Sequence, residues 1–183
     1  MRTILNLVFV GLFGPSLLVV HAETPDASSV KEGVVIAKLG DTKNVHAFGE
    51  TLLCGQPSAE DFLVAKGRGV EVVITLRKTA EIAWDEENVV KDLGMEFHRI
   101  AFGAPPTLTD DVFKKSLALL AANKGKSVML HCGSANRVGA IWLAHRVLND
   151  GVGLQAARQE AKEVGLRTIG YEQRALQYIA KEK

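Results

Sequence analysis

Apolar residues along the chain predict strands alternating with helices. The stretches VEVVITL (70–76) and SVMLH (127–131) are almost continuously apolar, as in strands buried on both faces of a sheet. TLLCG (51–55), stopped by Gly55 and Pro57, and MEFHRI (95–100) predict two more strands. A short apolar run from Val34 to Leu39 is consistent with one edge strand.

Helical spacing fills the segments between these strands. Ser58 and Asp61 form a capping-box pattern that opens a helix with Ala59, Phe62 and Leu63 on one face. WDEENVVKDLG predicts a second helix. Four more are expected at 110–123, at 137–149, which is apolar almost all round, and near 154–164 and 171–180.

This alternation predicts an α/β fold of three layers. We expect a central, mostly parallel sheet of four to five strands with helices on both faces, spanning residues 46–183. Ligand sites in such sheets lie at the carboxyl ends of the strands, which is where the sequence places His131 and Cys132.

The first 45 residues differ from the rest of the chain. Residues 1–22 carry one cation, Arg2, then an uncharged apolar run interrupted by Gly14-Pro15, which is typical of a cleaved export signal. The sequence therefore predicts a periplasmic or secreted protein that starts at Glu23 and has no stable membrane insertion. Residues 23–45 are expected to form a flexible N-terminal segment.

Charge and composition exclude several functions. The 22 Lys and Arg balance 21 Asp and Glu, which argues against a nucleic-acid partner, and the mature length suits a single monomeric domain. His46, His98 and His145 have no metal-ligand spacing, so neither a metal nor another cofactor is expected. The two cysteines, Cys54 and Cys132, could form a disulfide in an exported protein.

The segment HCGSANR (131–137) carries the candidate chemistry. A loop between a strand and a helix can point several backbone N–H groups at an anion, and the helix dipole adds positive potential there. Cys132 in that field is expected to lose its proton readily, and the fork of Arg137 suits the oxygens of a tetrahedral anion. The alternative is a buried free cysteine without a function.

This segment resembles the phosphate loop of cysteine-dependent phosphatases of the dual-specificity and tyrosine class. GQPS, VITLR with Glu81, and HCGSANR are similar, more narrowly, to the bacterial family of beta-lactamase-hydrolase-like phosphatase domains. The resemblance covers roughly residues 48–181.

The resemblance implies a phosphatase whose substrate is a phosphorylated protein or small molecule. Cys132 would attack phosphorus to form a thiophosphoryl intermediate, and Asp110, or less favourably Asp111, would protonate the leaving oxygen. The phosphate would be bound by Arg137 and the loop Gly133, Ser134, Ala135 and Asn136, with His131 either orienting the loop or simply ending a strand. Arg77 would lie near the site or pair locally with Glu81.

Two departures from the usual loop keep other functions open. Four residues separate Cys132 from Arg137 where five are usual in these phosphatases, although the narrower bacterial family also has four. The residue after the arginine is usually Ser or Thr, and here it is Val138. A tight loop suits a persulfide sulfur, so a rhodanese-like sulfurtransferase is one alternative. A catalytically weak or inactive oxyanion-binding module is the other.

Overall fold

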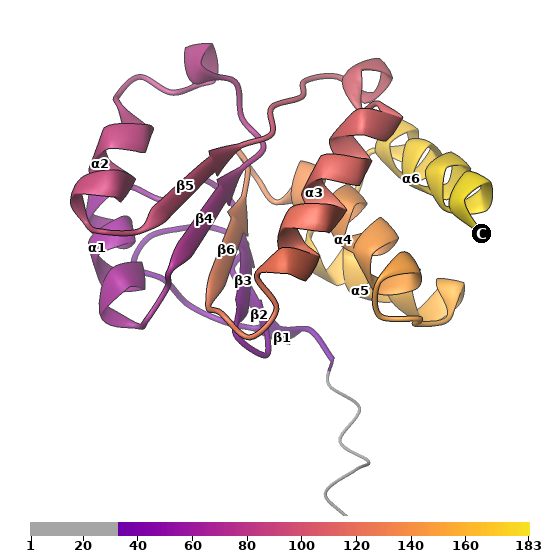
Figure 1. Cartoon of the computed structure of the whole chain (residues 1–183), viewed down its shortest axis with the longest axis horizontal. Helices are drawn as coiled ribbons and strands as arrows, with labels where there is room; N and C mark the ends of the chain where they lie inside the picture. Colours follow the sequence, from indigo (N-terminus) through magenta and orange to yellow (C-terminus); the bar gives the residue numbers. More distant parts are fainter. Residues whose placement is uncertain (1–32) are drawn as a thin grey trace, which may run out of the picture. The chain divides into compact units, whose positions relative to one another are not determined.

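A six-stranded mixed sheet forms the centre of the molecule (Figure 1), and the computed structural model describes residues 33–183. The spatial order of the strands is β1-β2-β3-β6-β4-β5. β3, β6, β4 and β5 are parallel neighbours, whereas β1, β2 and β3 pair antiparallel. The strands are β1 (Val35–Ile36), β2 (His46–Phe48), β3 (Thr51–Cys54), β4 (Val72–Thr75), β5 (Glu96–Arg99) and β6 (Val128–His131).

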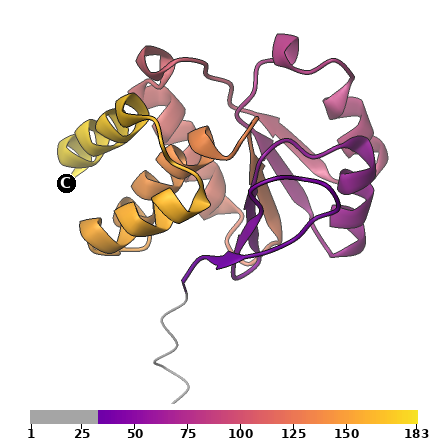
Figure 2. The ribbon, with the colours of Figure 1, turned by 180° about the vertical axis from the view of Figure 1, so that it is seen from behind.

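Six helices cover the two faces of this sheet, as the alternating pattern predicts. α1 (Ala59–Gly67) and α2 (Glu86–Asp92) cover one face, and the other four cover the opposite face (Figures 1 and 2). These four are α3 (Asp110–Ala122), α4 (Asn136–Leu148), α5 (Leu154–Val164) and α6 (Ile169–Glu182). Two short 3₁₀ turns, η2 (Thr79–Glu81) and η3 (Pro105–Thr107), lie in the loops after β4 and β5.

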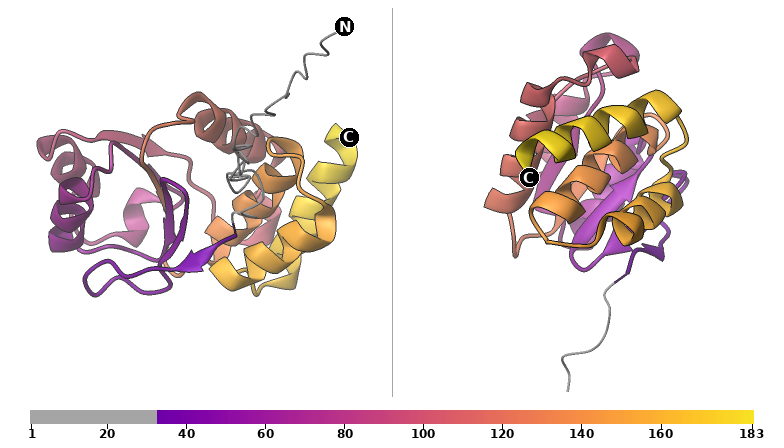
Figure 3. Two further views of the ribbon diagram at one scale, coloured as in Figure 1. Left: turned by 90° about the horizontal axis from the view of Figure 1, so that it is seen from below. Right: turned by 90° about the vertical axis from the view of Figure 1, so that its right-hand side faces the viewer.

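The central helix α4 carries the segment that follows the HCGSANR loop. It contacts α3, α5 and α6, and nine of its thirteen residues are buried. The side view shows it enclosed by these helices (Figure 3). A Cβ atom on Gly139 would meet the backbone oxygen of Ala161 at 2.7 Å, so the close approach of α4 and α5 requires glycine there.

The strand register brings three carboxyl ends together. Cys54, His131 and Thr75 lie side by side on β3, β6 and β4, and Cys132 follows directly after the middle strand. β6 is buried along its whole length. The candidate loop therefore starts from the centre of the sheet, as the sequence predicts.

The sheet has more strands than the four to five expected, because a short hairpin extends one edge. β2 and β3 are joined through Gly49, whose φ of +50° is readily adopted by glycine, and β1 adds the outermost strand. Leu39 and Val45 are buried in the core next to α1. Residues 33–45, expected to be flexible, thus belong to the folded unit, whereas the expected signal at 1–22 and residues 23–32 lie outside the described part.

The two cysteines are free thiols. Because side chains alternate along a strand, Cys54 packs in the core beneath α1 and α2 and Cys132 in the larger core on the other face. Burial raises the pKa of the Cys54 thiol. The structure therefore does not contain the disulfide considered from the sequence.

Residues 33–183 contain neither a helix that could span a membrane nor a cluster of metal-binding side chains. None of the helices there combines the length and apolar character needed to cross a bilayer. In the same residues, no three His, Cys, Asp or Glu side chains cluster in a way that could hold a metal ion.

Candidate active site

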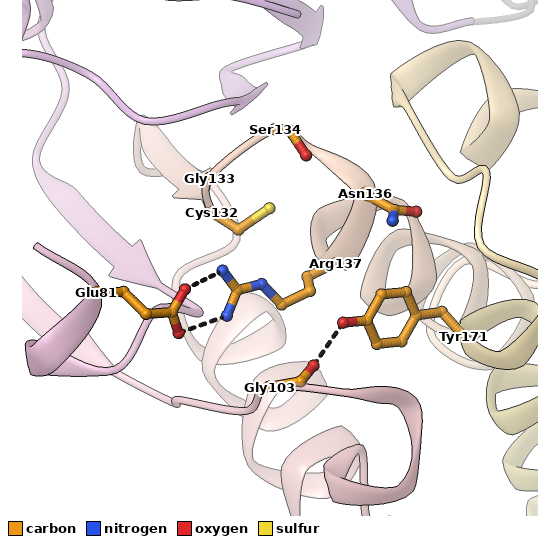
Figure 4. Close-up of a pocket in the computed structure, with 8 residues that line it drawn as sticks. All are labelled: Glu81, Gly103, Cys132, Gly133, Ser134, Asn136, Arg137 and Tyr171. Atoms are coloured by element: carbon orange, nitrogen blue, oxygen red, sulfur yellow. Dashed lines mark hydrogen bonds and ion pairs between the residues drawn. The ribbon is translucent and has the colours of Figure 1, made fainter.

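The loop after β6 leaves the start of α4 uncapped. Ala135 occupies the N-cap position with a left-handed φ of +62°, and its side chain cannot accept a hydrogen bond. Within residues 33–183, no backbone carbonyl accepts from the N–H groups of residues 133 or 135–137. These donors, with the positive end of the helix dipole, are available to an anion next to Cys132 (Figure 4).

Arg137 is held beside this loop by one carboxylate and two backbone carbonyls. Its Nη2 donates to Glu81 Oε2 at 2.6 Å and its Nη1 to Glu81 Oε1 at 3.0 Å. Nη1 also donates to the carbonyl oxygens of Leu76 and Phe102, which follow β4 and β5. These bonds fix one edge of the guanidinium, and Nε, on the other edge, forms no hydrogen bond to the described residues.

Glu81 is the carboxylate that orients Arg137. Hydrogen bonds from Arg137 lower the pKa of Glu81 to about 2, so this carboxylate stays ionised near neutral pH. Arg77 also contacts Glu81. Its Nε lies 3.6 Å from Glu81 Oε2, and its Nη2 donates to the Glu81 backbone oxygen. Gln56 Oε1 in turn accepts from Arg77 Nη1 at 2.6 Å. Arg77 thus lies near the site and pairs locally with Glu81.

These groups surround a pocket of about 310 Å³. Its wall on the side of α6 is Tyr171, whose hydroxyl donates to the backbone oxygen of Gly103 (Figure 4). Neither residue could be predicted from a local sequence pattern, because the fold brings both to the loop from distant segments. The residues lining the pocket are Glu81, Gly103, Cys132, Gly133, Ser134, Asn136, Arg137 and Tyr171.

Residues 167 and 168, between α5 and α6, form hydrogen bonds to the loop that follows β6. The side-chain oxygen of Asn136 accepts from the backbone N–H groups of Arg167 and Thr168, and its Nδ2 donates to Thr168 Oγ1 at 2.7 Å. Arg167 donates to the Ser134 hydroxyl at 2.7 Å. The Asn136 side chain therefore stabilises the conformation of the loop.

The side chains of His131 and Ala135, both named as candidate site residues from the sequence, do not line the pocket. His131 points to the opposite face of the sheet, where its Nε2 lies 3.5 Å from Glu86 Oε1 and its ring packs edge-on against Phe62. Burial lowers the pKa of His131 to about 3. The Ala135 side chain is also fully buried, so this residue can offer only its backbone N–H group.

Asp110, expected to be the general acid, lies outside the pocket. It is in the first turn of α3 with its carboxylate 2.6 Å from Lys181 Nζ and 3.4 Å from Arg174 Nη2, and the hydrogen bond from Lys181 lowers its pKa. Asp111 pairs with Lys115. The loop 101–109 contains no Asp or Glu, and among residues 33–183 Glu81 is the only carboxylate that lines the pocket.

Comparison with solved structures identifies the architecture. A candidate phosphatase (DUF442) of Shewanella putrefaciens CN-32 matches with a TM-score of 0.66 at 19% identity, over 79% of this chain and 96% of that one. TpbA of P. aeruginosa matches with a TM-score of 0.65 at 17% identity, over 84% and 92%. The chain has the fold of the cysteine-dependent phosphatases.

The same phosphatase fold appears in kinase associated phosphatase, with a TM-score of 0.64 at 12% identity over 72% of this chain and 86% of that one. That structure carries a serine in place of its catalytic-site cysteine. No protein-family model and no curated protein sequence matches the chain. The similarity therefore lies in the three-dimensional structure rather than in overall sequence.

Proposed function

We propose that this protein is an exported cysteine-dependent phosphatase that hydrolyses phosphate monoesters through a thiophosphoryl-cysteine intermediate. The observation that carries the proposal is the convergence of Cys132, the uncapped start of α4 and Arg137 on one pocket. The phosphatase fold supports the same reaction class, and TpbA of P. aeruginosa has been solved with phosphotyrosine. The charge of bound phosphate would be balanced by backbone N–H groups and the free edge of Arg137.

The reaction proceeds in two displacements. The Cys132 sulfur attacks phosphorus, an S–P bond forms, and the bond from phosphorus to the leaving oxygen breaks with its electron pair going to that oxygen. Water then attacks phosphorus, the S–P bond breaks, and phosphate leaves with the Cys132 thiolate restored. The proton lost by water balances the proton taken up by the leaving oxygen.

The group that donates a proton to the leaving oxygen determines which phosphate esters react readily. Glu81 is ionised and bound to Arg137, and Asp110 is paired with Lys181 outside the pocket. Without a protonated carboxylic acid near the pocket in the described part of the chain, an aryl phosphate loses its stable phenolate more readily than an alkyl phosphate loses an alkoxide. We therefore expect aryl phosphates, such as phosphotyrosine, to be turned over faster than phosphoserine.

Hydrolysis of p-nitrophenyl phosphate tests the proposal directly. The wild-type domain, residues 23–183, is expected to release p-nitrophenol at a rate that Cys132→Ser abolishes and that Cys54→Ser leaves within about twofold, because Cys54 lies in the other core. Equal rates in the wild type and Cys132→Ser would reject an enzymatic role for this cysteine.

A non-catalytic oxyanion-binding module is the second candidate. It is favoured by the lack of a protonated carboxylic acid among the described residues that line the pocket, and by Val138 at the position after Arg137. It predicts that tungstate raises the melting temperature of the wild type with no Cys132-dependent turnover. A rhodanese-like sulfurtransferase would instead transfer sulfur from thiosulfate to cyanide.

Export and quaternary state belong to the same proposal. Residues 1–22 form the proposed signal, which would release a periplasmic or secreted monomer starting at Glu23. N-terminal sequencing of protein recovered from the periplasm or medium after expression of the full chain tests the cleavage site. Retention of the intact N-terminus in the cytoplasm would contradict it.

A further inference from the structure

A phenol hydroxyl lies in the same pocket as Cys132 and Arg137. Tyr171 belongs to the first turn of α6, and its hydroxyl donates to the backbone oxygen of Gly103. Figure 4 shows this hydroxyl pointing toward Gly103 and the Arg137 side chain, and all four residues line the pocket. The hydroxyl is therefore held at the wall of the pocket that contains the proposed nucleophile.

The position of the hydroxyl is fixed by the packing of α6 against the loop after β5. The Tyr171 ring packs edge-on against Phe102, with 5.9 Å between the ring centroids. A Cβ atom on Gly170 would meet η3 at 2.9 Å, so the start of α6 lies directly against this loop. The backbone oxygen of Phe102 also accepts from Arg137 at 2.6 Å. The next carbonyl along the chain binds the Tyr171 hydroxyl, so one short segment positions both the guanidinium and the phenol.

Among the described residues that line the pocket, Tyr171 is the best proton donor. Burial raises the pKa of Tyr171, while the positive charge of Arg137 acts in the opposite direction, so the phenol keeps its proton near neutral pH. Glu81 is ionised, and Cys132 must be ionised to attack phosphorus. The Ser134 hydroxyl is a much weaker acid than a phenol, and a guanidinium holds its protons more tightly. Tyrosine is among the side chains that act as general acids in enzymes.

We propose that Tyr171 is the general acid of the reaction and donates its phenol proton to the leaving oxygen. This inference rests on the proposed phosphatase function. While the S–P bond forms and the bond from phosphorus to the leaving oxygen breaks, the proton moves from Tyr171 to that oxygen and leaves a tyrosinate. The tyrosinate then takes a proton from the attacking water, which restores the phenol.

Two features of the site suit this transfer. The O–H bond can turn about its C–O bond from Gly103 toward the substrate without movement of the ring. The charge of Arg137, which opposes the rise in the pKa of Tyr171, stabilises the tyrosinate while it exists. A phenol in this position does the work for which the loop after β5 has no carboxylic acid.

Three substrates that differ in their leaving group test the proposal in Tyr171→Phe. The basicity of the leaving oxygen rises from p-nitrophenyl phosphate to phenyl phosphate to benzyl phosphate, and so does its need for a proton. We expect kcat/KM to fall within about twofold for the first, about 10-fold for the second and about 100-fold for the third. Because kcat/KM reports the steps up to formation of the intermediate, its later hydrolysis by water does not hide the effect.

Tyr178→Phe is the matched control. Tyr178 is also on α6, but its ring stacks on Phe113 and does not line the pocket. This variant should keep all three rates within about twofold of the wild type. If Tyr171→Phe lowered kcat/KM equally for the three substrates, the hydroxyl would only position the loop after β5, and the proposal would be wrong.

A measurement on the wild type needs no variant at Tyr171. For benzyl phosphate, kcat/KM should be lower in heavy water than in water, because a proton moves as the ester bond breaks, whereas for p-nitrophenyl phosphate the two solvents should give similar values. Equal solvent ratios for the two substrates would refute the proposal. Failure of the phosphatase function itself would appear differently, as the absence of Cys132-dependent turnover of p-nitrophenyl phosphate, and would remove the general acid together with the reaction.

Discussion

Replacing Glu81 by Gln should weaken oxyanion binding and turnover by disturbing Arg137 rather than by removing a group that touches substrate. The substitution keeps the size of the side chain but removes the charge that accepts two hydrogen bonds, at 2.6 Å and 3.0 Å, from the guanidinium. Arg137 would still be bound to the carbonyls of Leu76 and Phe102, so its position should loosen rather than be lost.

The size of the effect follows from the pair itself. Lowering the pKa of Glu81 from 4.5 to about 2 corresponds to at most about 3 kcal/mol. Because the Glu81 side chain is 32% exposed, solvent screening reduces this to about 1 kcal/mol. We expect a fall in kcat/KM of about 5-fold, since 1.4 kcal/mol is tenfold, and a melting temperature lower by about 2–4 °C.

The assay measures p-nitrophenyl phosphate hydrolysis in the active protein and tungstate affinity in the Cys132→Ser background. Glu87→Gln is the matched control, because Glu87 forms an exposed pair with Lys91 on α2. The pKa of Glu81 is depressed, so its stabilising contribution is present above about pH 4.5 and is lost only as pH falls towards 2. If Glu81→Gln and Glu87→Gln behaved alike within twofold at pH 7, the orienting role of Glu81 would be refuted.

Three further predictions concern other parts of the structure. Asp110→Asn should leave kcat for p-nitrophenyl phosphate within about twofold, because its partner is Lys181 rather than the substrate, and a loss of 100-fold would restore it as the acid. Gly139→Ala should lower the free energy of unfolding in urea by about 2 kcal/mol, since the new methyl meets the Ala161 backbone, whereas Gly67→Ala should not cause this loss. Burial lowers the pKa of His131 to about 3, so the unfolded chain binds a proton that the folded one excludes, and stability should fall by up to about 1.4 kcal/mol per pH unit from pH 6.5 towards 3. Between pH 6.5 and 3, the melting temperature of His131→Gln should fall less steeply than that of the wild type. Parallel curves for the two proteins would show that His131 does not cause the loss of stability.

Patterns that repeat along one element were sufficient to predict much of the fold. Strands β4 and β6 are apolar because both of their faces are covered, and that burial appears directly as continuous apolar runs. The capping box at Ser58 and Asp61 is present in the structure. The phosphatase-like three-layer architecture follows from these elements and is shared with the solved phosphatases.

Properties that depend on distant segments could not be predicted in the same way. Leu63, expected on the buried face of α1, is 61% exposed, whereas Asp61 is buried because Asp41 and Thr42 bond to its carboxylate. Tyr171 reaches the pocket only through the packing of α6. The position of Asp110 in the chain favours it as the acid, and only the folded structure shows that its carboxylate pairs with Lys181.

One misplacement could have been avoided from the sequence. Consecutive side chains in an extended strand point to opposite faces, so His131 and Cys132 cannot both face the loop if β6 continues through them. The structure follows this rule, with His131 next to Glu86 and Cys132 in the pocket. Alternation was therefore a stronger guide to His131 than its position next to the cysteine.

The bonds from Arg137 to the carbonyls of Leu76 and Phe102 tie the ends of two strands to the first turn of α4. The guanidinium thus also has a structural role, since without it the buried Phe102 carbonyl would lose its donor and the buried Leu76 carbonyl would keep only the Phe102 N–H, at 3.3 Å. A protein with this fold could therefore replace the cysteine at little cost to stability but would still depend on the arginine to hold the strand ends. We expect inactive proteins of this fold to retain the arginine equivalent to Arg137 after the cysteine equivalent to Cys132 has been lost. The presence of this arginine alone is therefore poor evidence of activity.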